Sequence, residues 1–204
     1  MIDSSTAGHV SQYLAATAMI DSENPKVVRK AAELTRSCHS DVEKARVFYE
    51  WVRDSYTRDK VDSYIASEVL ERGGNLCYQR SILLTALCRS VGIPARLHLQ
   101  KVSIKDWRNP PDGRINTISF AHGLTGLYLN GQWNVYEATG NSYKWFQFTG
   151  DKSEAAEMVV DFDPDKDCLF DMARNPRVTG ELLSAHFVDW TEGLVELIEQ
   201  MNDF

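Results

Sequence analysis

The sequence predicts an α+β fold in which helices come first and antiparallel strands follow. Two observations lead to this prediction. Apolar residues recur at helical spacing over roughly the first ninety residues, and after Pro94 the spacing changes to the alternation typical of strands. An Asn130-Gly131 pair then separates two runs with strand character, which is the pattern of a tight hairpin turn.

Two amphipathic helices are expected before the glycines at 73 and 74. The first has Asn24 as its N-cap and Pro25 at the first helical position. The second begins at Ser40, where Glu43 three residues later completes a capping box. A short helix or turn over residues 63–74 leads into the glycines.

The run from Cys77 to Val91 predicts a central, largely buried helix, because its apolar residues cover more than half of the helix circumference. Gly92 stands where a helix commonly ends, and Pro94 prevents continuation.

Strands and one final helix are expected after this point. Residues 95–104 predict a strand whose inward side chains require one bulge, and residues 118–129 and 133–139 predict the two arms of the hairpin. Residues 143–148 suggest a further strand. The apolar spacing over residues 179–200 predicts a C-terminal amphipathic helix. The nucleophile-bearing helix at Cys77 is expected to pack on the antiparallel sheet, in a single domain spanning residues 1–204.

Composition and charge exclude several classes of function. The chain has 204 residues and a formal net charge of −7, which argues against nucleic-acid or anionic-membrane partners. The apolar runs are far shorter than the ~20 residues of a membrane span, and no signal-peptide pattern opens the chain. We therefore expect a soluble, cytoplasmic protein, with secretion as the alternative if a leader has been removed; the pattern does not predict an oligomeric state.

The four cysteines are scattered and match no structural zinc pattern. Two disulfides are formally possible, but a chain of this length does not need them, and we expect reduced thiols. The run "DFDPDKD" at residues 161–167 lacks the glycine and glutamate of a calcium loop, so a solvated acidic loop is expected and no metal or cofactor. We expect His186 to be partly buried on the last helix and His98 to be structural.

Three residues together suggest catalysis. Cys77 opens a helix, where the positive end of the dipole and a neighbouring imidazolium stabilise a thiolate. His122 lies on the first hairpin arm and Glu137 on the second, and the turn at 130–131 makes them direct or diagonal cross-strand neighbours. Each residue alone has a structural explanation: a small core cysteine, a histidine satisfied by backbone, a solvated carboxylate. Their combination favours nucleophilic catalysis.

The stretch "GGNLCYQRSILLTALCRSVGIPAR", with the later "H…YLNGQWNVYEAT", resembles the transglutaminase-like superfamily of papain-fold cysteine enzymes, in particular its bacterial cysteine-protease type. The upstream "ARVFYEWVRDSYTRD" is also similar to that family, and the resemblance covers about residues 25–140. It implies that Cys77 is the nucleophile, His122 the general base and acid, and Glu137 the orienting carboxylate. The family usually has aspartate at the acid position, and many relatives have a small residue and a tryptophan after the histidine, where this chain has Gly123 and Leu124.

The leading hypothesis is a thiol-dependent hydrolase of amide or peptide bonds that proceeds through a thioester. An acyl transferase that forms amide or isopeptide bonds, and a non-catalytic binding module, remain the alternatives. The expected substrate is a peptide, a protein or a small amide. Tyr56, Tyr78 and Trp51 are candidates to line the cleft, although Trp51 can equally be a core residue. Gln79 and Asn75 flank the nucleophile and are candidate oxyanion donors.

Overall fold

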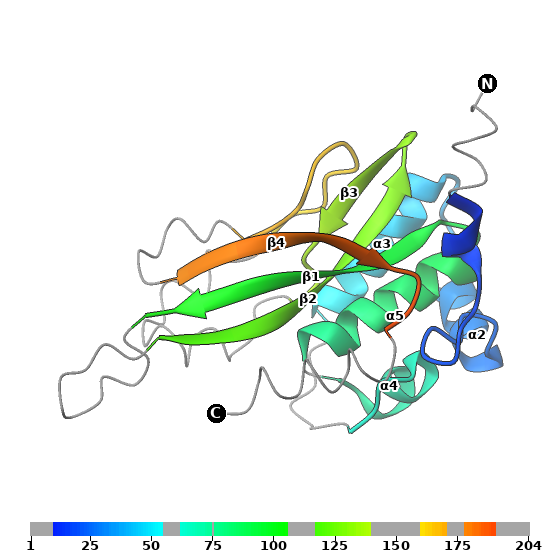
Figure 1. Ribbon diagram of the computed structural model, residues 1–204. Coiled ribbons are helices and arrows are strands. Elements are labelled where there is room, and N and C mark those ends of the chain that lie inside the picture. The colour runs from blue at the N-terminus through cyan, green and yellow to red at the C-terminus, as the bar shows by residue number, and fades with distance from the viewer. Residues whose placement is uncertain are drawn as a thin grey trace.

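Helices precede strands along the chain, as the sequence predicts (Figure 1). The computed structural model describes residues 10–54, 62–74, 76–105, 117–139, 160–170 and 178–190. Its helical elements are η1 (Gln12–Leu14), α2 (Pro25–Leu34), α3 (Asp41–Asp54), α4 (Ala66–Arg72) and α5 (Cys77–Ser90). Its strands are β1 (Ala95–Ile104), β2 (Ile118–Leu129), β3 (Gln132–Tyr136) and β4 (Val178–Phe187). The predicted strand over residues 143–148 lies outside the described residues.

The starts of the first two long helices follow the predicted capping residues. The side chain of Asn24 accepts a hydrogen bond from the Lys26 N–H at 3.0 Å, and Pro25 is the first residue of α2. Before α3, the Glu43 N–H donates to Ser40 Oγ and the Ser40 N–H donates back to Glu43 Oε2, both at 3.2 Å. Both helix starts are therefore specified by local hydrogen bonds.

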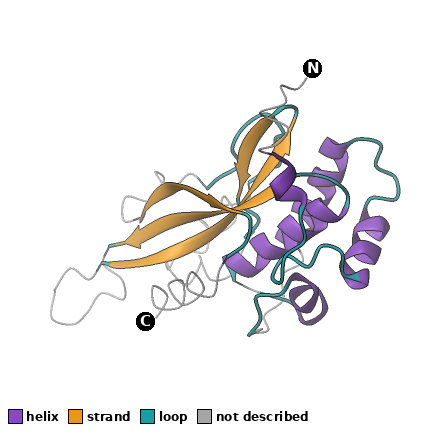
Figure 2. Cartoon of the chain, turned by 45° about the vertical axis from the view of Figure 1, so that its right-hand side comes forward, coloured by secondary structure: helices purple, strands orange, loops and turns teal. Residues whose placement is uncertain are grey.

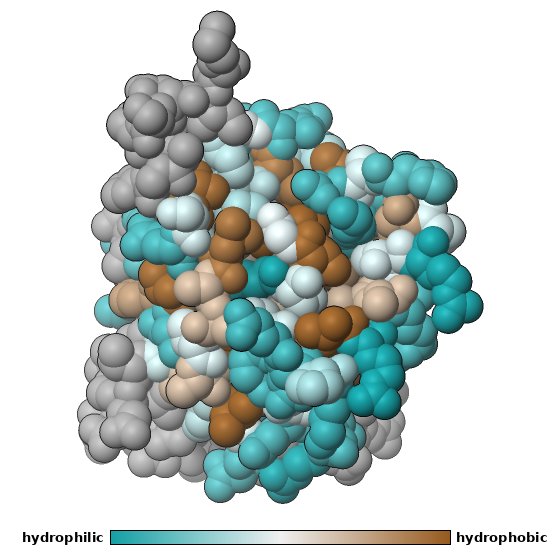
Figure 3. Space-filling view, turned by 90° about the vertical axis from the view of Figure 1, so that its right-hand side faces the viewer, coloured by the Kyte–Doolittle hydropathy of each residue, from teal (hydrophilic) through white to brown (hydrophobic). Residues whose placement is uncertain are grey.

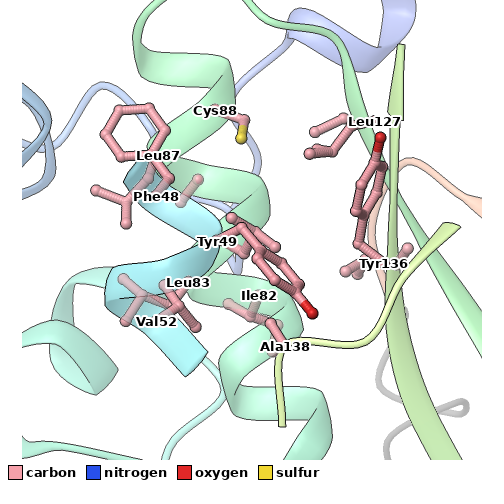
Figure 4. Packing of buried hydrophobic residues seen from close by; sticks show 14 of the residues in the cluster. Phe48, Tyr49, Val52, Ile82, Leu83, Leu87, Cys88, Leu127, Tyr136 and Ala138 are labelled. Atoms are coloured by element: carbon pink, nitrogen blue, oxygen red, sulfur yellow. The ribbon is translucent and has the colours of Figure 1, made fainter. Parts of the chain in front are cut away.

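Helix α5 is the central element of the fold. Every residue from Tyr78 to Arg89 is buried, which confirms the predicted central helix. It contacts α2, α3 and α4 as well as β1 and β2, and the helices gather on one side of the curved sheet (Figure 2). In the close-up of the core, Tyr49 of α3 lies between the helices and the strand that carries Tyr136, and the centroids of the two tyrosine rings are 6.0 Å apart (Figure 4). The first turn of α5 is thereby held by a well-packed core.

The four strands form an antiparallel sheet in the order β3-β2-β1-β4. The hairpin between β2 and β3 turns at Asn130 and Gly131, whose φ angles are 50° and 85°. These positive angles match the right-handed twist of the flanking strands and explain the Asn-Gly pair. The predicted hairpin is confirmed.

The expectation that a bulge turns all the apolar residues of β1 to one face is wrong. The β1–β2 ladder is continuous from Ala95 to Ile104, so the alternation is not shifted by a bulge; the irregularity lies in the β1–β4 ladder, between His98 and Gln100. Ala95, Leu97 and Leu99 face the helices, whereas Val102 and Ile104 belong to a second apolar cluster with Phe120, Phe170 and Val178. One face of the sheet is therefore buried near the start of β1, and the opposite face is buried near its end.

The helix predicted over residues 179–200 is wrong in its first half, because residues 178–187 form strand β4 beside β1 (Figure 1). The backbone groups on that edge of β1 need hydrogen-bond partners, and this long-range pairing overrides the helical spacing of the apolar residues. His186, predicted to be partly buried, is exposed in β4. Residues 191–200 lie outside the described residues.

The acidic segment is attached to the sheet rather than fully solvated. Asp167 Oδ1 accepts a hydrogen bond from the Val135 N–H at 2.7 Å, and Cys168 forms a parallel bridge with Tyr136. Asp161 itself is exposed. Within the described residues, no three histidine, cysteine, aspartate or glutamate side chains are placed to share a metal ion.

The four cysteines, all in the described part of the chain, are free thiols, as expected. Hydrophobic side chains on the face seen in Figure 3 form small patches interrupted by hydrophilic ones. None of the helices that the structure describes combines the length and apolar character needed to cross a membrane.

Candidate active site

Cys77 is the first residue of α5 and is half-buried. The first N–H groups of a helix have no acceptor within the helix, so they and the helix dipole favour negative charge at this point. Ser81 Oγ, one turn later, donates to the Cys77 carbonyl at 3.0 Å. The sulfur therefore lies at the positive end of a helix that is buried from Tyr78 to Arg89.

His122 and Glu137 are brought together by the hairpin register. Thr125 of β2 pairs with Tyr136 of β3. Continuing that register places Glu137 opposite Leu124, so His122, two residues along on the same face, is its diagonal neighbour. His122 Nε2 and Glu137 Oε2 form a hydrogen-bonded ion pair, and the two side chains are only 2% and 1% exposed. The sequence-based placement of this pair is confirmed.

Glu137 is fixed from several directions. Its second carboxylate oxygen, Oε1, accepts hydrogen bonds from the N–H of Thr139 at 3.2 Å and from the Thr139 hydroxyl. Its backbone carbonyl accepts a bond from the Tyr49 hydroxyl, and its N–H donates to the Cys168 carbonyl, both at 2.9 Å. These contacts fix both the backbone of Glu137 and the carboxylate oxygen that does not face His122.

The environment of His122 favours its protonated form. Burial is the largest single influence and by itself would lower the pKa of the imidazole. The charge of Glu137, the charge of Cys77 and hydrogen bonds to both side chains act in the opposite direction. Together they hold the pKa of His122 well above its ordinary value of 6.5. The imidazole therefore lies between a carboxylate and a thiol.

Gly123 brings strand β2 into direct contact with the start of α5. Its N–H donates to Cys77 Sγ at 3.3 Å. A Cβ atom at position 123 would lie only 2.6 Å from Tyr78 Cα. Since strands and helices normally meet through their side chains, this backbone contact is unusually close, and it places the sulfur beside the histidine-bearing strand.

The structure favours packing roles for Tyr78 and Trp51 over the predicted roles in a cleft. Tyr78 is 6% exposed, and its ring stacks on Tyr64 at 5.3 Å between centroids. Trp51 is half-buried on α3, with Lys30 Nζ lying 5.0 Å from the centre of its ring. Tyr56 lies outside the described residues.

Gln79 has a structural position in the turn before the nucleophile. Its side-chain oxygen accepts a bond from the Leu76 N–H at 3.3 Å, and its amide nitrogen donates to the Ser63 carbonyl at 3.1 Å. These contacts favour stabilisation of the turn over the predicted donation to an oxyanion. Asn75, the other predicted donor, lies outside the described residues.

Sequence reasoning missed the residues that hold Glu137. Thr139 carries a local signal, because a threonine two residues after an acid can donate to it through both its N–H and its hydroxyl. Tyr49 carries no comparable signal, since it lies 88 residues away from Glu137 along the chain.

Comparison with known proteins identifies the family of this chain. The family model of the Transglutaminase-like superfamily matches residues 28–148, which is more than half of the chain and contains Cys77, His122 and Glu137. The chain belongs to the transglutaminase-like superfamily. Its helices and curved antiparallel sheet form the α+β core expected for that superfamily.

A protein from Cytophaga hutchinsonii, named as a proposed cysteine protease in its crystal structure, is similar to this chain. The two sequences are 22% identical and the structures superpose with a TM-score of 0.49. The match covers 65% of this chain and 42% of that one, so this chain spans less than half the length of that structure. We infer neither residue roles nor an activity from this similarity. No curated protein matches the chain significantly.

Proposed function

We propose that the protein is a thiol-dependent hydrolase of amide or peptide bonds, with Cys77 as nucleophile, His122 as general acid and base, and Glu137 as the orienting carboxylate. The observation that carries this proposal is the position of the His122 imidazole, which interacts with the side chains of both Cys77 and Glu137. Membership of a superfamily of cysteine enzymes supports it.

In the first half of the reaction, the Cys77 thiolate adds to the carbonyl carbon of the substrate, and the carbonyl electron pair moves onto oxygen. The N–H of Cys77 at the helix start donates to this oxyanion. The oxyanion then collapses, the C–N bond breaks, and the His122 imidazolium transfers its proton to the departing amine. The products of this half are a free amine and a thioester on Cys77.

In the second half, water attacks the thioester and neutral His122 accepts its proton. The tetrahedral intermediate collapses with cleavage of the C–S bond, which releases a carboxylic acid and restores the thiolate beside an imidazolium. Glu137 stabilises the imidazolium at both points in the cycle because it lies against Nε2. If an amine enters in place of water, the same thioester yields a new amide, and the protein acts as an acyl transferase.

A peptide library with and without added primary amines tests the proposal, with products identified by mass spectrometry. The wild type is expected to give either cleavage products or amine adducts, and Cys77→Ala neither. Cys38→Ala is the matched control, because Cys38 is also a half-buried free thiol but lies beyond α2, outside the site. Products that persist in Cys77→Ala, or a wild type that gives none, would contradict the proposal.

A further inference from the structure

We propose that the backbone N–H of Gly123 is a catalytic group, which donates to the Cys77 thiolate and holds the sulfur beside His122. Glycine is required at this position because a side chain would separate β2 from the start of α5. This inference rests on the proposed function for its catalytic meaning, whereas the hydrogen bond itself can be measured independently of turnover.

The contact is direct and involves the reacting atom. The Gly123 nitrogen lies 3.3 Å from Cys77 Sγ, within hydrogen-bond distance for a sulfur acceptor. Hydrogen bonds strengthen when the acceptor carries a full charge, so this N–H favours the thiolate over the thiol. It favours the thiolate again when the C–S bond of the thioester breaks, since the sulfur is then the leaving group.

The Gly123 N–H is available because β3 is short. The β2–β3 ladder stops at the pair Thr125–Tyr136, two residues before Gly123. Beyond Tyr136 the chain leaves the ladder, and the N–H of Thr139 turns to the Glu137 carboxylate. The end of β3 thus leaves a strand N–H unpaired by the sheet at the place that the sulfur occupies.

The steric requirement for glycine is equally local. A Cβ at position 123 would lie 2.6 Å from Tyr78 Cα and 2.9 Å from Tyr78 N. These are backbone atoms of the first turn of α5, so no flexible side chain can move away to make room. Alanine must therefore push the strand and the helix start apart, which lengthens both the N–H···S contact and the approach of Cys77 to His122.

Gly126 on the same strand provides a matched control. A Cβ there would lie 2.8 Å from Nε2 and 2.9 Å from Cδ2 of His98, which are side-chain atoms at the end of a rotatable group. Gly126→Ala therefore makes the same chemical change in β2 without pressing on the backbone of α5.

The decisive experiment is nuclear magnetic resonance of the ¹⁵N-labelled protein. The amide proton of Gly123 is expected to resonate downfield in the wild type and to move upfield in Cys77→Ala and after alkylation of Cys77 with iodoacetamide. The Gly126 amide serves as the internal reference and is expected to stay in place. A Gly123 amide proton with the same shift in all three samples would overturn the inference.

Alkylation rates give the second readout. Near pH 6, Gly123→Ala is expected to slow the reaction of Cys77 with iodoacetamide roughly ten-fold or more, the factor that corresponds to a hydrogen bond to a charged group, while Gly126→Ala leaves the rate unchanged. Equal rates in a folded Gly123→Ala variant would also overturn the inference, and the spectroscopic test decides alone if that variant does not fold. A shift that responds to Cys77 in a protein without turnover would refute the proposed hydrolase activity and leave the hydrogen bond standing.

Discussion

Replacing Glu137 by glutamine removes the negative charge beside His122 and leaves a side chain of nearly the same shape. In the wild type that charge opposes the effect of burial and keeps the pKa of the imidazole well above 6.5. In Glu137→Gln only Cys77 still opposes the effect of burial, so the pKa of His122 is expected to fall substantially. The imidazolium that protonates the leaving amine and pairs with the thiolate is then lost near neutral pH.

The magnitude follows from the burial and contact of the pair. The two side chains are 2% and 1% exposed, so salt screens their interaction only weakly. Charges about 4 Å apart at an effective dielectric constant of about 20 interact by about 4 kcal/mol, which corresponds to roughly a thousand-fold in rate. We therefore expect kcat/KM to fall by about a thousand-fold, within the range of about 10² to 10⁴ that general acid–base catalysis contributes.

Stability is expected to respond with a definite sign. A raised pKa in the folded state means that His122 contributes stability that is fully present below its unfolded pKa of about 6.5 and is lost as the pH rises through the folded pKa. In Glu137→Gln the folded-state pKa is lower, so this contribution to stability is smaller and is lost at a lower pH.

The assay is a titration of the imidazole of His122 by nuclear magnetic resonance, together with urea denaturation at several pH values. Glu181→Gln, on an exposed position of β4, is the control and is expected to change neither measurement. An imidazole that titrates at the same pH in the wild type and in Glu137→Gln would refute the reasoning.

Three further substitutions test the surroundings of the site. Thr139→Val removes the hydroxyl that donates to Glu137 and is expected to lower kcat/KM roughly ten-fold. Thr139→Ser retains the hydroxyl and is expected to retain kcat/KM. An equal loss in both variants would contradict the role of the hydroxyl. Tyr49→Phe leaves the buried carbonyl of Glu137 without this donor and is expected to lower the free energy of unfolding by about 1–3 kcal/mol in urea denaturation; an unchanged midpoint would count against the contact. Arg89 donates to three backbone carbonyls from separate segments, which a lysine cannot reach together. Arg89→Lys is therefore expected to lower the free energy of unfolding by about 2–4 kcal/mol in the same measurement. A loss below about 1 kcal/mol would show that these hydrogen bonds are dispensable.

Features with local signals were predictable from the sequence. The Ser40–Glu43 capping box, the Asn130-Gly131 turn and the buried helix at Cys77 each depend on residues within a few positions of one another. The pairing of His122 with Glu137 is also local, because a short hairpin sets its register.

Features that depend on distant partners were not predictable. Strand β4 has a helical apolar pattern and becomes a strand only because β1 has an edge to pair with. The two faces of β1 are distinguished by the apolar groups that cover them, and Val102 packs against Phe170 from a segment far along the chain. The Gly123 N–H acquires its partner because β3 ends early and α5 approaches closely, and neither fact has a local signal.

The central claim is that Cys77 forms a thiolate beside a protonated His122. Alkylation of the wild type with iodoacetamide near pH 6, far below the usual thiol pKa of about 8.5, tests it most directly when each cysteine is followed by mass spectrometry. Cys77 is expected to react much faster than Cys38, the other half-buried thiol, while buried Cys88 and Cys168 stay unmodified. Equal rates at Cys77 and Cys38 would contradict the claim.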